Sequence, residues 1–129
     1  MRKLFITYLI LLPIFCLAQS NKNIHTKKEQ QFIIERKVID TIMHIEEVAL
    51  MDILTRKNSN GKRHFNYAIW SRPSRETPYY WVKVREVKGF SFVTHYNFYV
   101  YPKDFSIKYL DPVSDTLISL KEFSKQIHK

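Results

Sequence analysis

The chain has 129 residues, with 21 Lys and Arg against 12 Asp and Glu, a formal net charge of +9 and only two glycines. This length accommodates one domain, and the 45% share of hydrophobic residues excludes a chain that is disordered throughout. Two glycines also exclude collagen-like sequences, glycine-rich repeats and the dinucleotide-binding fingerprint. The composition therefore predicts a small, basic, aromatic-rich folded domain.

Residues 1–18 have the pattern of a secretory signal peptide. A positively charged start precedes the apolar residues 4–15, and Cys16 and Ala18 place small residues three and one positions before Gln19. We expect cleavage near Ala18-Gln19 and export to the periplasm or the cell exterior. Two alternatives stay open: an uncleaved N-terminal anchor, and a lipoprotein lipidated on Cys16.

Cleavage would leave residues 19–129 as a single α+β domain, ordered roughly over 26–127. This mature chain would have 111 residues and a charge of +7, since Arg2 and Lys3 are lost with the leader. It would contain no cysteine, which excludes disulfides, thiol catalysis and cysteine-based metal sites. The apolar leader is shorter than the roughly 20 residues that a transmembrane span needs, and we expect no such span in the mature chain.

Residues 27–57 have the composition and spacing of helices. Thr26 and Glu29 predict a capping box at the start, and Glu46-Glu47 marks a second favourable start, since helix N-termini favour acidic residues. Asn60-Gly61 is expected to end the helical region. The pattern leaves open whether it is one bent helix or two. The apolar positions at near-helical spacing begin with Phe32, Ile33, Val38, Ile39, Ile42 and Met43.

The aromatic residues then predict a sheet. Fourteen of the sixteen aromatic residues after position 18 lie between residues 65 and 109, and aromatic enrichment is typical of strands. Four strands are expected, over 65–70, 79–87, 92–101 and 105–110. The links are short, which favours an antiparallel meander, and a capping box at Ser119 and Glu122 opens a C-terminal helix. The predicted fold is α+β: one or two N-terminal helices packed on a four-stranded antiparallel meander, with a short C-terminal helix.

Alternation along the strands sorts the two faces of this sheet. The inner face, toward the helices, is predicted to hold Tyr80, Val82, Val84, Phe98, Val100 and Ile107. Lys83, Arg85 and His95 fall on the other face, which is polar, basic and still aromatic.

The element order and three stretches carry a resemblance. They are Tyr79-Tyr80-Trp81-Val82-Lys83-Val84, the hairpin from Asn97 to Lys103, and Ser119-Leu120-Lys121-Glu122. Over roughly residues 30–127 the chain resembles a small exported bacterial domain of unassigned function in the cystatin-like and NTF2-like group, and more loosely PepSY-type domains. The inhibitory hairpin tip of cystatins does not occur here, so the resemblance does not imply protease inhibition, and a shared fold implies no function.

No catalytic motif is found. The five histidines lack the spacing of metal ligands, the serines occur in no nucleophile elbow, and Glu46 and Glu47 point to different sides of a helix. We therefore expect no metal, no cofactor and no enzymatic activity. The alternative is a small NTF2-like enzyme or ligand-binding pocket between helices and sheet, in which His95 would serve as a base.

A basic stretch is the feature that points to function. Six basic residues and no acid lie between positions 56 and 75, with aromatic residues among them. With two cations of the neighbouring strand, the candidate binding residues are Arg56, Lys57, Lys62, Arg63, Trp70, Arg72, Arg75, Lys83 and Arg85. The competing interpretation is ordinary solvated surface, and the sequence favours neither.

The functional interpretation is contact with an anionic partner, in which cations supply charge and rings supply stacking area. Export argues against nucleic acid, so none is expected. The sequence therefore predicts an exported, non-enzymatic binding or accessory domain for an anionic envelope component or an acidic protein.

Overall fold

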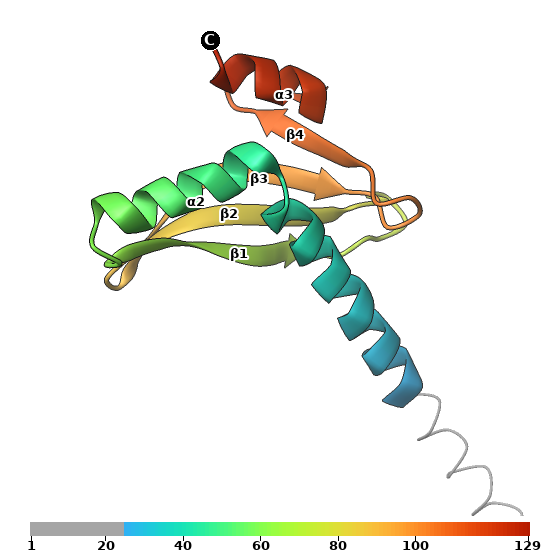
Figure 1. Cartoon of the computed structure of the whole chain (residues 1–129). Coiled ribbons are helices and arrows are strands. Elements are labelled where there is room, and N and C mark those ends of the chain that lie inside the picture. Colours follow the sequence, from blue (N-terminus) through green and yellow to red (C-terminus); the bar gives the residue numbers. More distant parts are fainter. Residues whose placement is uncertain (1–24) are drawn as a thin grey trace, which may run out of the picture. The chain divides into compact units, whose positions relative to one another are not determined.

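The computed structural model describes residues 25–129, drawn in colour in Figure 1. The chain divides into two compact units, Met1–Ile34 and Glu35–Lys129. Of the first unit only the helical residues 25–34 are described. The predicted signal peptide, its cleavage site and Cys16 lie outside the described residues.

The second unit is an α+β structure, as predicted. The helix that runs over residues 25–43 ends in it and is followed by α2 (Glu46–Asn58). An antiparallel meander follows, in which each strand pairs with the next along the chain. Its strands are β1 (Arg63–Ser71), β2 (Tyr80–Lys88), β3 (Ser91–Val100), β4 (Ile107–Asp111) and β5 (Thr116–Ser119). The C-terminal helix α3 (Leu120–Ile127) begins directly after β5.

The sheet has five strands and not the predicted four. The additional strand, β5, pairs with β4 and has only four residues. A strand of this length is too short to show an alternating pattern in the sequence. The Asp111 side chain stabilises the turn between the two strands by accepting hydrogen bonds from the Val113 N–H and the Ser114 hydroxyl. These bonds hold the pKa of Asp111 below its usual range.

The start of β4 also differs from the prediction. Phe105, expected in the strand, has a left-handed backbone with φ of 57° and lies in the turn that links β3 to β4. Its N–H donates to the Tyr101 carbonyl at 2.8 Å, and the Lys37 ammonium lies over its ring at 4.1 Å. The tight turn expected at Pro102-Lys103-Asp104 is confirmed, and the link continues through Phe105 and Ser106 to the start of β4 at Ile107.

The helical region consists of two helices. The first ends at residue 43, and Ile45 takes up an extended conformation with φ of −66° and ψ of 120° before α2 begins at Glu46. Ile45 is buried in the core, so the break is held by packing. Residue 25 is already helical, which shows that the first helix does not begin at Thr26 and that the first capping box was wrong.

The predicted end of α2 and the predicted start of α3 are confirmed. Asn60 and Gly61 both have positive φ, and the Gly61 N–H donates to the Arg56 carbonyl at 2.8 Å, which closes the end of α2. At α3 the Ser119 hydroxyl accepts from the Glu122 N–H, while the Glu122 carboxylate accepts from the Ser119 N–H. Both orphan amides of that first turn are thus satisfied.

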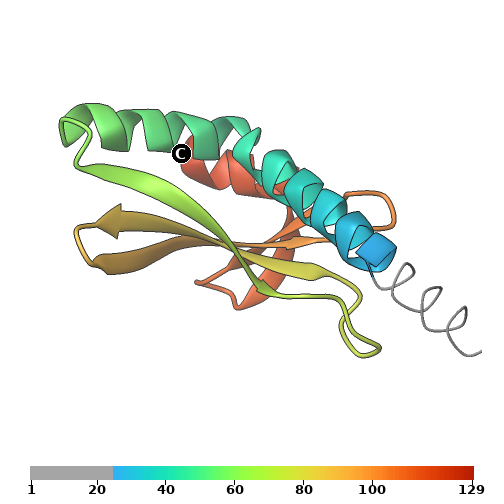
Figure 2. The ribbon, with the colours of Figure 1, turned by 90° about the horizontal axis from the view of Figure 1, so that it is seen from below.

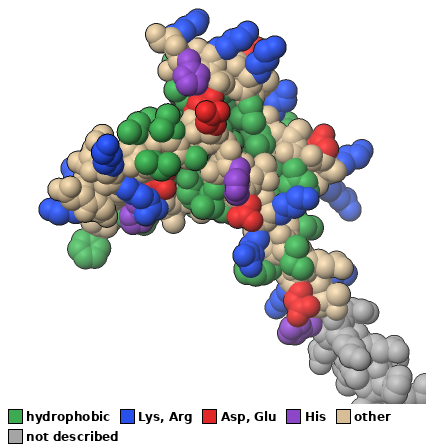
Figure 3. All heavy atoms as spheres, viewed as in Figure 1, with side chains coloured by type: hydrophobic (Ala, Val, Ile, Leu, Met, Phe, Trp, Pro, Cys, Tyr) green, Lys and Arg blue, Asp and Glu red, His purple; other side chains and the backbone are tan. Residues whose placement is uncertain are grey.

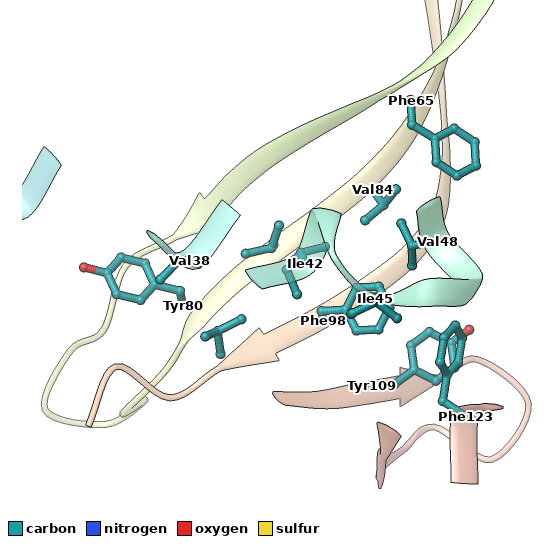
Figure 4. Packing of buried hydrophobic residues seen from close by; sticks show 12 residues of the cluster. Val38, Ile42, Ile45, Val48, Phe65, Tyr80, Val84, Phe98, Tyr109 and Phe123 are labelled. Carbon is teal, nitrogen blue, oxygen red and sulfur yellow. The ribbon is translucent and has the colours of Figure 1, made fainter. Parts of the chain in front are cut away.

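The core lies between the helices and one face of the sheet, which we call the inner face (Figure 4). The predicted inner residues Tyr80, Val82, Val84, Phe98 and Val100 are buried, and Ile107 packs against them. From α2 only Val48 is fully buried. From the helix of residues 25–43, Val38 and Ile42 reach the core, whereas Met43 is exposed. Phe32 and Ile33 of the predicted stripe belong to the other unit.

An irregularity in the pairing of β2 with β3 changes which face His95 joins. Val84 pairs with Tyr96, but the next residue, Arg85, pairs with Thr94, so His95 is an extra residue in β3. Its ring lies 5.4 Å from that of the buried Phe65, on the inner side. The prediction that His95 lies on the open face was wrong, because strict alternation does not anticipate a bulge.

Candidate functional site

The opposite side of β1–β3 is a surface that we call the outer face. Figure 2 shows α2 and α3 on the same side of the sheet, and within residues 35–129 no helix covers the other side. The strand pairing and the ring contacts place polar, charged and aromatic side chains there. They include Asn66, Trp70, Tyr79, Trp81, Lys83, Arg85, Phe92, Asn97, Tyr99 and Tyr101.

Lys83 and the two tryptophans lie together on this face. The Lys83 ammonium lies 3.7 Å from the centre of the Trp70 ring and 4.9 Å from that of Trp81. The two indoles meet edge to face at 6.4 Å, and Trp70 remains 55% exposed. Such cation–π contacts contribute about 0.5–1 kcal/mol at exposed sites. They also hold the lysine charge at a defined place on the sheet surface.

A row of rings continues from Trp81 across β3. Trp81 lies 5.9 Å from Tyr99, Tyr99 lies 4.5 Å from Tyr79, and Tyr79 lies 5.5 Å from Tyr101. The Trp81 indole N–H donates to the Asn97 side-chain oxygen at 2.9 Å, which fixes the orientation of the indole. Burial, followed by the neighbouring Tyr79, raises the pKa of Tyr99, so its hydroxyl stays neutral at physiological pH.

Arg85 supplies the second charge at the centre of the outer face. Its guanidinium donates to the Asn66 side-chain oxygen at 2.6 Å and lies 4.4 Å from the centre of the Phe92 ring. Its Nε is buried without a hydrogen-bond partner, the only such side-chain atom among the described residues. Phe92 itself is 54% exposed. The arginine is therefore held in place by an amide and a ring.

The outward positions of the strands carry cations. The outward strand positions bear Lys83, Arg85 and, on β4, Lys108, which pairs with Tyr99. The acidic residues Glu86 and Asp111, in β2 and β4, pair with inward positions such as Phe65. Among the described strands no carboxylate thus points outward, but Asp115 of the turn between β4 and β5 acts on Tyr99, and Glu122 of α3 interacts with Lys108. The part of the surface around Lys83 and Arg85 is therefore basic as well as aromatic.

The structure does not gather the predicted basic stretch into one surface. Arg63 begins β1 and Arg72 directly follows its last residue, so the two lie about 30 Å apart at about 3.3 Å per residue. Lys62 and Arg63 line an open hollow of about 500 Å³ beyond the end of the sheet, together with Ser59, Lys88 and Gly89. Arg56 and Lys57 lie in the last turn of α2.

Several of these cations are engaged in ion pairs. Arg56 pairs with Asp52 at 3.1 Å, and Arg63 pairs with Glu86 at 2.9 Å. Arg72 pairs with Glu35, and Arg75 lies exposed in the loop between β1 and β2. Of the nine predicted residues, the structure brings together Trp70, Lys83 and Arg85 on the outer face.

Sequence reasoning missed the residues that hold these three in place. Asn66, Asn97 and Phe92 contact the cations or the indoles directly. Alternation had already placed Asn97 outward, so a signal existed for that residue. Phe92 reaches this face only because of the bulge at His95, and no pattern in the sequence predicts that bulge.

His95 forms a separate cluster at the inner edge of the sheet. Its Nε2 lies 2.7 Å from the Glu86 carboxylate, whose other oxygen accepts from Arg63. Twelve buried side chains, from Val38 to Phe123, pack between the helices and the sheet, where the alternative interpretation requires a pocket. The imidazole of His95 is thus already engaged by a carboxylate at the edge of the sheet.

No group of three His, Cys, Asp or Glu side chains within residues 25–129 is placed to hold a metal ion. In the same part of the chain no helix combines the length and apolar character needed to cross a membrane. Comparison of the chain with protein-family models, curated proteins and solved structures gives no match.

Proposed function

We propose that this protein is an exported, non-enzymatic binding domain whose outer face contacts an anionic partner of the cell envelope. The observation that carries the proposal is the position of Lys83 and Arg85 among partly exposed rings, with no outward carboxylate nearby on the described strands. Export rests on the sequence pattern of residues 1–18. Outside the cytoplasm, the abundant anions include acidic glycans, lipid headgroups and acidic proteins.

An acidic glycan chain fits this surface best. The ring row crosses neighbouring strands, which lie about 4.8 Å apart, and so presents an extended track for a polymer. Aromatic rings offer apolar area on which the CH faces of sugars pack. The Lys83 contacts are with ring faces, so its N–H groups remain available to a carboxylate or sulfate.

The alternative of a small NTF2-like enzyme or ligand-binding pocket has less support. It would use His95 as a base, whereas the imidazole is already paired with the Glu86 carboxylate. An acidic segment of another protein remains the second partner of matching charge.

The two tryptophans of the chain provide a direct assay, since both lie on the outer face. We expect a polyuronate, and heparin as a sulfated probe, to change the intrinsic fluorescence saturably. Affinity should fall at least about tenfold between about 0.05 and 0.5 M salt, because screening weakens charged contacts. Neutral dextran should leave the emission unchanged, and anionic vesicles and a poly-glutamate chain distinguish lipid and protein partners.

A matched pair of variants separates the site from net charge. Lys83→Gln with Arg85→Gln should weaken polyuronate binding about tenfold or more, whereas Lys121→Gln with Lys125→Gln on α3 should change it less than about twofold. Both pairs remove two charges. Equal weakening by the two pairs, or dextran binding as tight as polyuronate binding, would contradict the proposal.

A further inference from the structure

Helix α2 carries a second apolar stripe that faces away from the core. Its residues Leu50, Ile53 and Leu54 are 49%, 61% and 39% exposed. They lie three and four positions apart, which is the spacing of one helix face. The core-facing side of the same helix is formed by Val48 and, partly buried, Met51. Figure 3 shows hydrophobic side chains exposed over this helix.

Two charged residues end this stripe with opposite signs. Glu46 lies four residues before Leu50, and Lys57 lies four residues after Ile53, so both extend the same face. Both are exposed, and neither makes an ion pair within residues 25–129 of one chain. By contrast Glu47 is held against α3 by Ser124 and His128, and Arg56 is paired with Asp52. The free charges of α2 are therefore those of the stripe.

The order of these residues is self-complementary. The midpoint between Glu46 and Lys57 is also the midpoint between Leu50 and Ile53. If a second α2 lies antiparallel across the stripe, Glu46 of each copy meets Lys57 of the other, and Leu50 of each meets Ile53. A two-fold symmetric contact requires this kind of reciprocity. The stripe has it in both charge and apolar packing.

We propose that the exposed stripe of α2, formed by Glu46, Leu50, Ile53, Leu54 and Lys57, is the interface through which two copies of this chain pair antiparallel. The proposal goes beyond the proposed function and does not depend on it. The interface would be smaller than the about 800 Å² per partner that is usual for stable complexes. The dimer is therefore weak, with dissociation in the range of about 10–1000 μM.

Such a dimer has a consequence for the outer face. Because α2 covers the inner side of the sheet, pairing through its far side leaves both outer faces free. Two linked copies then bind one polymer with a higher apparent affinity than one copy.

Sedimentation equilibrium of the protein, purified from the cell that makes it, tests the pairing. The wild-type mass should rise from monomer toward dimer as its concentration increases to about 1 mM. Glu46→Lys and Lys57→Glu should each weaken self-association at least about tenfold, because each places like charges together at both ends of the interface. The matched control, Lys121→Glu at an exposed position of α3, makes the same charge change as Lys57→Glu and should pair as the wild type does.

Mixing the two single variants provides the decisive measurement. In a mixed pair the lysine introduced at position 46 of one copy meets the glutamate introduced at position 57 of the other. At the opposite end the unchanged Lys57 meets the unchanged Glu46, so the dimer should return to about wild-type strength. A variant with both changes should pair with itself for the same reason. Ile53→Gln keeps a good helix former and adds no charge, and it should also weaken pairing.

Circular dichroism melts establish that each variant is folded. Any of four results would overturn the proposal. The first is a wild-type protein that stays monomeric up to about 1 mM, and the second is pairing that neither charge reversal weakens. The third is a failure of the two folded single variants to pair when mixed, and the fourth is Ile53→Gln pairing as strongly as the wild type. The second result would place the contact on another surface.

Discussion

The two faces of β2 differ sharply although their residues alternate along one strand. Val82 and Val84 are fully buried and contribute only apolar packing. Between and beside them, Lys83 and Arg85 lie on the opposite face, where they contact rings and amides at the surface. The inner face is constrained by close packing, which tolerates few changes. The outer face is constrained only by local contacts.

This difference shows where the chain has freedom to carry function. A surface residue away from caps and networks typically changes stability by less than about 0.5 kcal/mol, so the outer face can be modified with little cost to the fold. Binding and stability should therefore be separable in this protein. Four experiments test that separation, ordered by the size of the expected effect.

The largest effect is expected at Phe98 in β3. This ring is fully buried and lies 5.4 Å from those of Phe123 and Tyr109. Phe98→Ala should reduce the free energy of unfolding by about 3–5 kcal/mol, because it loses transfer energy and leaves a cavity. Phe92→Ala makes the same change on the outer face of the same strand and should cost about 1 kcal/mol or less. Equal losses in urea unfolding would show that the two faces do not differ.

A smaller loss is expected at Asp52, which connects α2 to the edge strand. Its carboxylate accepts from the Phe65 N–H at 2.7 Å and from Arg56 at 3.1 Å. Asp52→Ala should cost about 1–3 kcal/mol, because the strand amide loses its partner in a partly buried place. Arg56→Gln removes only the exposed pair and should cost less than about 1 kcal/mol. If the two variants melt alike, the backbone contact contributes nothing.

Lys83→Met sharpens the comparison on the outer face. The substitution keeps the length of the side chain and removes its charge from the two indoles, so the loss of stability should be about 0.5–1 kcal/mol. The tryptophan emission should shift, because both indoles lose a cation whose distances to their centres are 3.7 and 4.9 Å. Lys108→Met, on the same face but away from both indoles, should leave the emission as it is. An unshifted Lys83→Met spectrum would contradict the contact.

The smallest effect at neutral pH concerns Tyr67, where none is expected. Burial, followed by the negative charge of Asp52, raises the pKa of Tyr67 to about 12. A group whose pKa is raised on folding stabilises the protein fully below its unfolded pKa of about 10. That stability is lost as the pH rises from about 10 to about 12. Tyr67→Phe should therefore reduce the decline of the melting temperature at alkaline pH. If the melting temperature depends on pH as in the wild type, Tyr67 does not contribute to that decline.

The sequence by itself determined the class of fold and most of its elements. Alternation identified the inner residues of β2 and β3, because a one-residue slip would expose every valine of that face. The capping box at Ser119 and the Asn60-Gly61 ending are local signals, written within a few neighbouring residues, and both are confirmed. Trp70, Lys83 and Arg85 of the candidate site were also named from the sequence.

Tertiary structure decided what depends on partners distant in the chain. The bulge that moves His95 inward is a property of the pairing of β2 with β3. The break at Ile45 follows from its burial, and β5 exists because β4 lies beside it. The basic stretch looked continuous because neighbours in sequence are counted together, whereas an extended strand carries Arg63 and Arg72 to opposite ends of the sheet. Residues that are close in the sequence are close in space only over short distances along the chain. A binding surface is formed by residues that are close in space.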